Sequence, residues 1–209
     1  MENIIIKKVL IIGSGVMGSR IACYLSDVGL SVFLLDIIST NKNRNSIVNS
    51  NLNKTIKSRP EPLLDKSNVH NIKTGNIIDD INKIKDCDCI IEAVSEKEKI
   101  KKEVLDIIEI NKNKKSIVST NTSGLSINNL VKGRSKEFKE NFLGIHFFNP
   151  PRQLRLLEII PNKKTKKSIT DFFTDYCSKI LGKEVVLCKD TPGFIGNRVG
   201  IFSLMNCVH

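Results

Sequence analysis

The sequence predicts an α/β fold with a mostly parallel sheet, on three observations. Short aliphatic runs typical of buried strands alternate with segments of helical spacing along most of the 209 residues, as they do in βαβ units. A glycine-rich turn stands between the first aliphatic run and the first helical segment. The length suffices for one full domain and a fragment of a second.

Up to residue 120 the predicted strands alternate with helices, except that the strands at 69–74 and 89–94 follow one another. The run at 9–12 is almost wholly aliphatic, as expected of a strand covered on both faces. A helix follows because Ile21, Leu25 and Val28 recur at helical spacing, and Gly29 ends it. The predicted elements after the first strand are helices at 16–28, 41–59 and 96–110 and strands at 31–36, 69–74, 89–94 and 116–120.

Beyond residue 140 the pattern changes to strands with little helix between them. Candidate strands lie at 142–148, 154–160 and 184–188, and one helix lies at 165–181. The segment Asp190-Thr191-Pro192-Gly193 predicts a loop. An apolar helix then begins near Phe194 and runs to the end of the sequence.

The composition is that of a globular protein with excess positive charge. Hydrophobic residues make up 40% and charged residues 26% of the chain, which argues against wholesale disorder. The net charge of +11 favours an anionic partner, which could be nucleic acid, an anionic membrane or a phosphorylated small molecule. An AT-rich genome would also produce this abundance of lysine.

Several classes of protein are disfavoured by what the sequence lacks. The six cysteines form no C-x-x-C pair, so we predict no metal site. No apolar run approaches the roughly 18 residues that a membrane helix needs, and no signal peptide is recognisable. We therefore expect a cytoplasmic protein without a membrane partner.

The strongest local motif is Gly13-Ser14-Gly15-Val16-Met17-Gly18, a G-x-G-x-x-G pattern between strand and helix. The first glycine permits a tight turn, the second lets a pyrophosphate approach the backbone, and the third lets helix and strand pack closely. The helix N-terminus offers free N–H groups to phosphates. The candidate cofactor-binding residues of this turn are Gly13, Gly15, Val16, Met17 and Gly18.

The second predicted strand ends in Asp36, 23 residues after Gly13. An acidic residue there accepts hydrogen bonds from the adenosine ribose hydroxyls of a dinucleotide, and its charge would repel the 2′-phosphate of NADP. The strand, glycines, helix and Asp36 together predict a turn that binds the phosphates of NAD. The alternative is an ordinary strand–helix turn with a solvent-facing aspartate.

A histidine and a glutamate lie in successive predicted strands. His146 stands in Gly144-Ile145-His146-Phe147-Phe148, and Glu158 stands in Leu156-Leu157-Glu158-Ile159-Ile160. A buried carboxylate needs a partner, and adjacent strands would let Glu158 fix the tautomer of His146 and raise its basicity. From these residues alone, a packing role and a general-base role both stay open.

Five segments occur in one order: the glycine motif, Thr120-Asn121-Thr122-Ser123, His146-Phe147-Phe148-Asn149-Pro150, Leu156-Leu157-Glu158 and Asp190-Thr191-Pro192-Gly193-Phe194-Ile195-Gly196-Asn197-Arg198. Together they resemble the L-3-hydroxyacyl-CoA dehydrogenases over nearly the whole chain, and most of all the long bacterial members fused to an enoyl-CoA hydratase-like part. The resemblance implies NAD-dependent oxidation of a 3-hydroxyacyl-CoA to the 3-oxoacyl-CoA in fatty-acid β-oxidation.

The resemblance also implies roles for individual residues. His146 matches the family's general base, and Glu158 matches its carboxylate partner. Ser123 and Asn197 match the residues that hold the substrate oxygens, although Ser123 could instead cap a helix and Asn197 could be a plain polar residue. The remaining implied cofactor-side residues are Asp36, Glu96, Lys101, Ser123 and Asn149. Lys97 follows Glu96 where the family usually has asparagine.

The resemblance implies a Rossmann-type, doubly wound NAD-binding domain followed by an all-helical domain that aids dimerisation and covers the acyl chain. We therefore expect residues 1–189 to form the NAD-binding domain. Residues 190–209 would be the linker and first helix of a truncated helical domain. We also expect this chain to form a homodimer or to pair with a separately encoded C-terminal part.

Residues 41–60 contain five basic and no acidic side chains. The phosphates of coenzyme A would be attracted by such a segment, and the family binds coenzyme A near it. Lys54, Lys57 and Arg59 are therefore candidate substrate-binding residues, with a solvated basic face as the alternative. The segment has no aromatic residues, so we do not expect nucleic-acid binding.

Two other functions stay open. A truncated or degenerate NAD-binding module without activity would explain why apolar residues such as Ile201, Phe202 and Leu204 lack the cover of a helical domain. A related dehydrogenase could instead act on a small free hydroxy acid. Activity on free 3-hydroxybutyrate compared with its CoA ester separates this enzyme from the leading prediction.

Overall fold

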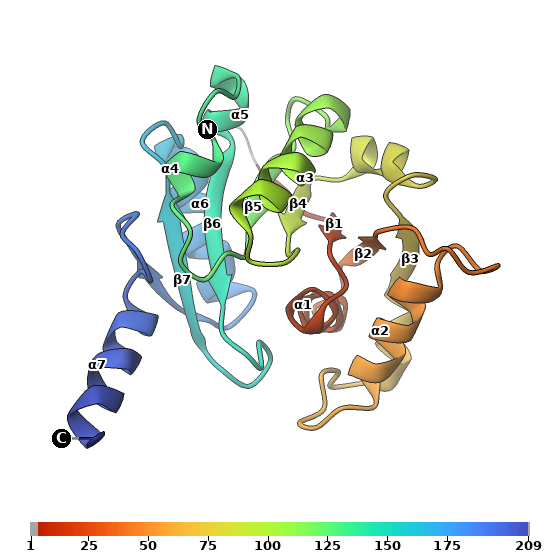
Figure 1. The fold of residues 1–209 in the computed structure, drawn as a ribbon, viewed down its shortest axis with the longest axis horizontal. Helices are drawn as coiled ribbons and strands as arrows, with labels where there is room; N and C mark the ends of the chain where they lie inside the picture. Colours follow the sequence, from red (N-terminus) through yellow and green to blue (C-terminus); the bar gives the residue numbers. More distant parts are fainter. Residues whose placement is uncertain (1–3, 209) are drawn as a thin grey trace.

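One eight-stranded sheet organises the chain, which the computed structural model describes over residues 4–208. Its strands are β1 (Lys8–Ile12), β2 (Ser31–Asp36), β3 (Ile72–Asn76), β4 (Cys89–Glu92), β5 (Ile117–Thr120), β6 (Phe142–Phe147), β7 (Leu156–Pro161) and β8 (Glu184–Leu187). They lie in the order β3-β2-β1-β4-β5-β6-β7-β8, and all neighbours run parallel except β6 and β7 (Figure 1). The predicted α/β fold with a mostly parallel sheet is confirmed.

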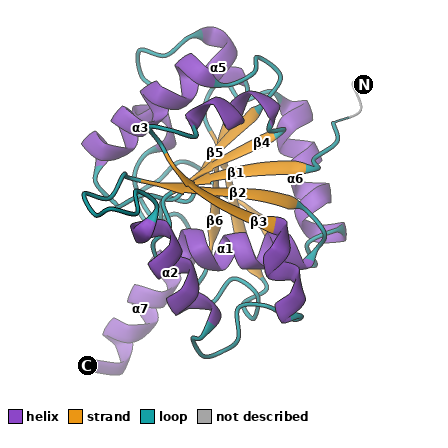
Figure 2. Ribbon diagram, turned by 90° about the vertical axis from the view of Figure 1, so that its right-hand side faces the viewer, coloured by secondary structure: helices purple, strands orange, loops and turns teal. Residues whose placement is uncertain are grey.

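Helices cover both faces of the sheet, as Figure 2 shows. The α-helices are α1 (Val16–Asp27), α2 (Ser46–Ile56), α3 (Glu98–Asn111), α4 (Ile127–Leu130), α5 (Lys136–Glu140), α6 (Lys167–Lys179) and α7 (Gly196–Val208). Along β1, Val9 and Ile11 pack in one apolar cluster with α1, α2 and α6, while Leu10 and Ile12 pack in another with α3, α4 and α5. Strand alternation thus gives a three-layer domain with two cores.

The strand predicted at 69–74 is wrong in its first half. Residues 69–71 belong to a 3₁₀ helix, η1 (Lys66–Asn71), and β3 begins only at Ile72. The side chain of Asp65 accepts a hydrogen bond from the Ser67 amide at 2.8 Å, and such a local cap favours a turn over an extended chain. The short helices α5 and η2 (Ile81–Asp86) have too few residues for a recognisable helical period.

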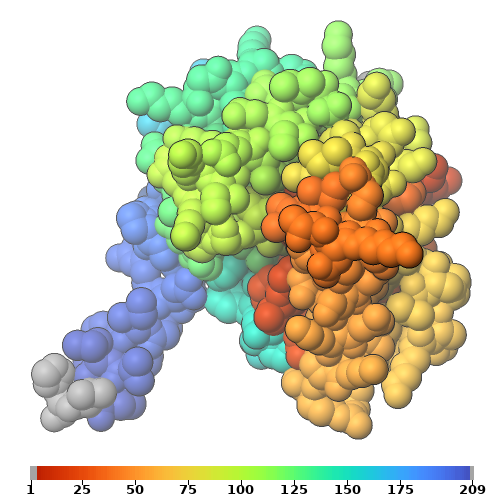
Figure 3. Space-filling model, turned by 45° about the vertical axis from the view of Figure 1, so that its right-hand side comes forward, coloured from red at the N-terminus to blue at the C-terminus, as the bar shows by residue number. Residues whose placement is uncertain are grey.

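Helix α7 projects from the body of the domain, as Figures 1 and 3 show. Phe194, just before it, is fully buried, whereas Ile201, Phe202 and Leu204 are each more than half exposed. None of the helices in the described part of the chain combines the length and apolar character that a membrane crossing requires.

Candidate active site and cofactor-binding turn

The three glycines of the motif between β1 and α1 have different surroundings. Gly13 has φ +105°, and a Cβ there would lie 2.6 Å from the Ala93 carbonyl oxygen. A Cβ at Gly18 would lie 1.8 Å from the Gly13 carbonyl oxygen, whereas a Cβ at Gly15 would meet no atom within 4 Å. The first and third glycines therefore serve close packing, and the second leaves open space beside the start of α1.

This turn fits the phosphates of a dinucleotide. Helix α1 begins at Val16 without a side-chain cap, so the first amides of the helix, which lack intrahelical partners, remain available to an anion. Beside the turn, Asp36 ends β2, and its Oδ2 accepts hydrogen bonds from the Ser14 amide and hydroxyl at 2.6 and 2.5 Å. Asn51 of α2 donates to the same hydroxyl at 3.0 Å.

His146 and Glu158 lie directly opposite each other in the antiparallel pair β6 and β7. Both side chains point to the face covered by α3 and α4, because their neighbours Ile145 and Leu157 pack into the opposite core. The Nδ1 atom of His146 lies 2.7 Å from Oε2 of Glu158. The structure therefore contains the pair that the sequence predicts, while its catalytic role stays a prediction.

Glu158 is 1% exposed, and its second oxygen, Oε1, accepts hydrogen bonds from the amides of Ile195 and Gly196 at 2.9 and 2.7 Å. Burial acts to raise the pKa of Glu158, but the hydrogen bonds from His146 and the two amides hold it below its ordinary value. An ionised carboxylate only accepts hydrogen bonds. Nδ1 of His146 therefore carries a proton that faces Glu158, and in the neutral imidazole Nε2 has the lone pair that can accept another proton.

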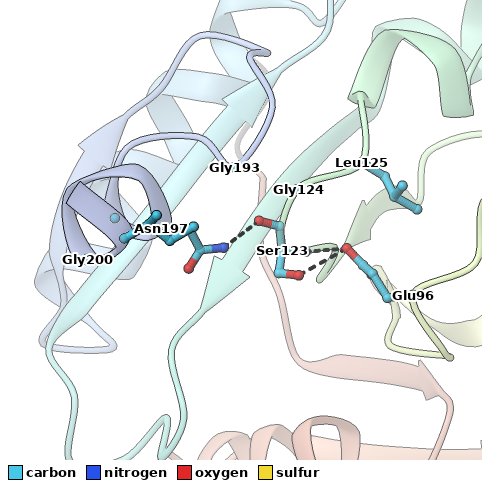
Figure 4. A pocket seen from close by; sticks show the side chains of 9 residues that line it. Glu96, Ser123, Gly124, Leu125, Gly193, Asn197 and Gly200 are labelled. Atoms are coloured by element: carbon cyan, nitrogen blue, oxygen red, sulfur yellow. Dashed lines mark hydrogen bonds between the residues drawn. The ribbon is translucent and has the colours of Figure 1, made fainter. Parts of the chain in front are cut away.

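An open pocket of about 490 Å³ lies between the loops after β4 and β5 and the start of α7 (Figure 4). Its lining consists of Glu96, Ser123, Gly124, Leu125, Gly193, Gly196, Asn197, Gly200 and Ile201. Three predicted site residues, Glu96, Ser123 and Asn197, thus share one pocket. His146 and Glu158 are not among the described residues that line it, but Glu158 binds the amide of Gly196, which is.

Hydrogen bonds join the polar residues of this pocket, as the dashed lines in Figure 4 show. The side-chain amide of Asn197 donates to the carbonyl oxygen of Ser123 at 2.8 Å. Oε1 of Glu96 accepts from the amide and hydroxyl of Ser123 at 2.8 and 3.1 Å and from the hydroxyl of Thr122 at 2.5 Å. Burial acts to raise the pKa of Glu96, but Thr122, the Lys101 charge and Ser123 together hold it below its ordinary value.

Lys101 contacts Glu96 but is not among the residues that line the pocket. Its side chain is 1% exposed, and its Nζ lies 2.8 and 3.1 Å from the two carboxylate oxygens of Glu92 and 3.3 Å from Oε2 of Glu96. A direct contact between Lys101 and the cofactor stays a prediction. Sequence reasoning missed Glu92, although a carboxylate that ends an otherwise apolar strand is a signal of a buried partner.

Met17 of the glycine motif is partly exposed, and four other predicted site residues, Lys54, Lys57, Arg59 and Asn149, are exposed. Asn149 follows β6 outside the pocket lining. Lys54 lies near the end of α2, and Lys57 and Arg59 follow that helix, with Arg59 paired to Glu61. Their cofactor and coenzyme contacts stay predictions. Within residues 4–208, no group of three or more metal-ligating side chains is assembled.

Comparison with known proteins gives a consistent result. Residues 8–191 match the family model described as "3-hydroxyacyl-CoA dehydrogenase, NAD binding domain". The chain is 42% identical to a probable 3-hydroxyacyl-CoA dehydrogenase of Bacillus subtilis, over 96% of this chain and 27% of that protein. It is 39% identical to a protein of the same description from Deinococcus radiodurans, over 97% of this chain and 59% of that protein.

A solved structure shares the architecture. The (S)-3-hydroxybutyryl-CoA dehydrogenase PaaH1 from Ralstonia eutropha superposes with a TM-score of 0.75 at 30% identity, over 93% of this chain and 68% of that one. The chain spans less than two thirds of the length of the two curated relatives. The match to the family model covers most of the chain, and the chain therefore belongs to the 3-hydroxyacyl-CoA dehydrogenase family and contains that family's NAD-binding domain.

Proposed function

We propose that this chain takes part in the NAD-dependent oxidation of a 3-hydroxyacyl-CoA to the 3-oxoacyl-CoA in fatty-acid β-oxidation. The observation that carries the proposal is the buried His146–Glu158 pair, whose carboxylate also binds the amide of Gly196, the first residue of α7, beside the pocket. Similarity to the dehydrogenases named above supports the substrate class.

His146 and Glu158 have different roles in alcohol oxidation. Nε2 of His146 takes the proton of the 3-hydroxyl group while the C3–H bond breaks and the carbonyl double bond forms. Bound NAD supplies the acceptor for the hydride that leaves C3. The Glu158 carboxylate, 2.7 Å from Nδ1, stabilises the imidazolium that results. Ser123 and Asn197 are the polar side chains of the pocket that can hold the substrate oxygens.

The proposal extends to the surroundings of the site. The exposed Lys54, Lys57 and Arg59 would meet the phosphates of coenzyme A, since α2 also contacts the glycine turn through Asn51 and Ser14. Residues 1–189 would form the NAD-binding domain, and 190–209 the linker and first helix of a helical domain. A homodimer or a separately encoded C-terminal part would cover α7. The six free cysteines agree with a reducing compartment such as the cytoplasm.

A spectrophotometric assay tests this function. The chain should oxidise NADH at 340 nm with acetoacetyl-CoA and far more slowly with free acetoacetate. His146→Gln should abolish turnover and keep NADH binding, measured by fluorescence. The matched control is His70→Gln, at an exposed position of η1, which should leave both unchanged. Equal activity on the free acid would favour the hydroxy-acid enzyme, and NADH binding without turnover would favour an inactive module.

A further inference from the structure

Three charged side chains contact one another in succession between the interior of the protein and the pocket. Glu92 ends β4 and is fully buried, Lys101 lies in the first turns of α3 and is 1% exposed, and Glu96 reaches the pocket. The Lys101 ammonium contacts both carboxylates, at 2.8 Å on Glu92 and 3.3 Å on Glu96. It also donates to the carbonyl oxygen of Val94 at 3.2 Å. The ammonium group of Lys101 therefore contacts three residues of the five-residue segment 92–96.

The buried carboxylate of Glu92 is hydrogen-bonded through both of its oxygens. Oε1 of Glu92 accepts from the Val94 amide at 2.7 Å, and Oε2 accepts from the hydroxyl of Thr120, the last residue of β5, at 2.5 Å. A buried ion pair contributes little net stability compared with well-packed apolar residues. In this protein the pair also holds the Val94 backbone and the Thr120 hydroxyl in fixed positions.

The segment 92–96 touches both halves of the site. On one side, Ala93 lies against the glycine turn so closely that a Cβ at Gly13 would be 2.6 Å from its carbonyl oxygen. On the other side, Glu96 binds both the amide and the hydroxyl of Ser123. The conformation of this segment therefore sets the position of the pocket relative to the cofactor-binding turn.

We propose that Glu92 and Lys101 are positioning residues that fix the segment 92–96 and, through Glu96, hold Ser123 in place at the pocket. This role rests on the proposed dehydrogenase function. Lys101 is the charged group that the structure places against Glu96, and it comes from α3. The groups that face Glu96 from the loop after β5, Thr122 and Ser123, are neutral.

An NMR titration of the Ser123 amide tests the link without any turnover. Because this amide donates to Glu96, its chemical shift should report the ionisation of that carboxylate, and Glu96→Gln should abolish the titration. In the double variant Glu92→Gln/Lys101→Met, which removes both buried charges together, the midpoint should rise, because the nearer of the two lost charges is the Lys101 ammonium 3.3 Å from Glu96. An unchanged midpoint in this double variant, with an unchanged melting profile, would overturn the proposal.

A kinetic cycle tests the consequence for the reaction. Glu92→Gln/Lys101→Met should lower kcat/KM roughly 10- to 100-fold, and it should cause no further loss when added to Glu96→Gln, because it acts through that residue. Independent, multiplying losses would overturn the proposal. Lys102→Met is the matched control, since Lys102 pairs on the surface with Glu98. If the wild-type chain shows no turnover, the proposed function fails while the Ser123 titration still decides this inference.

Discussion

Replacing Glu158 with glutamine is the sharpest test of the histidine–glutamate pair, because the structure dictates which way the new amide must face. Oε1 accepts from the amides of Ile195 and Gly196, and turning an NH₂ group toward them would leave two partly buried donors unpaired. That orientation costs about 1–3 kcal/mol for each donor. The amide oxygen therefore stays on α7, and the NH₂ group faces Nδ1 of His146.

An NH₂ group at this place can only donate, so Nδ1 of His146 must become the acceptor. The proton then moves to Nε2, and the nitrogen that should take the substrate proton has lost its lone pair. General-base catalysis contributes roughly 10²- to 10⁴-fold to a rate, and a wrong tautomer forfeits most of this contribution. We expect kcat to fall by about that factor with little change in NADH affinity.

Stopped-flow or steady-state oxidation of NADH with acetoacetyl-CoA measures kcat, and fluorescence titration measures NADH binding. Glu184→Gln is the control, since Glu184 pairs with Arg155 at an exposed position of β8 and should leave both quantities unchanged. A loss smaller than about tenfold for Glu158→Gln would refute the tautomer argument. A loss of NADH binding would instead indicate a disturbed fold.

Two further predictions concern stability. Gly18→Ala should lower the melting temperature by several degrees, because its Cβ would lie 1.8 Å from the Gly13 carbonyl oxygen. Gly15→Ala places its Cβ in open space and should weaken NADH binding without changing the melting temperature. Equal melting temperatures for the two variants would contradict this prediction. Burial lowers the pKa of Lys183 to about 8, so between about pH 8 and 10.5 the unfolded chain binds more protons at this residue than the native chain. The stability of the wild type relative to Lys183→Met, measured by urea denaturation, should therefore rise across that window, and a constant difference would count against it.

The parts of the site that depend on local sequence could be predicted from it. The glycine turn is encoded within six residues: Gly13 and Gly18 occupy places that a Cβ would not fit, and Gly15 leaves open space beside the start of α1. The His146–Glu158 pair could be anticipated because a short connection between two strands brings their residues into register. In both cases the interacting residues are neighbours in the chain or in adjacent strands.

The parts that depend on which side of a helix is buried could not be predicted. The apolar pattern of α3 runs through Ile100, Val104, Ile107 and Ile108, but the structure buries Lys101 with Val104, Leu105 and Ile108. A lysine on the inner face of a helix contradicts hydrophobic patterning unless its counter-charge is known. That counter-charge is Glu92, and the sequence does not indicate which of several lysines in α3 it pairs with.

The hydrogen bonds from Ile195 and Gly196 to Glu158 bear on how this domain could be recombined with others. The sheet ends with β8 and the family match ends at residue 191, yet Asn197 and these two amides still belong to the site. A fusion junction placed directly after the sheet would leave the carboxylate of Glu158 without two of its donors. The smallest transferable module therefore extends through the first turn of α7, a limit set by the contacts of Glu158 and Asn197 rather than by the secondary structure of the sheet.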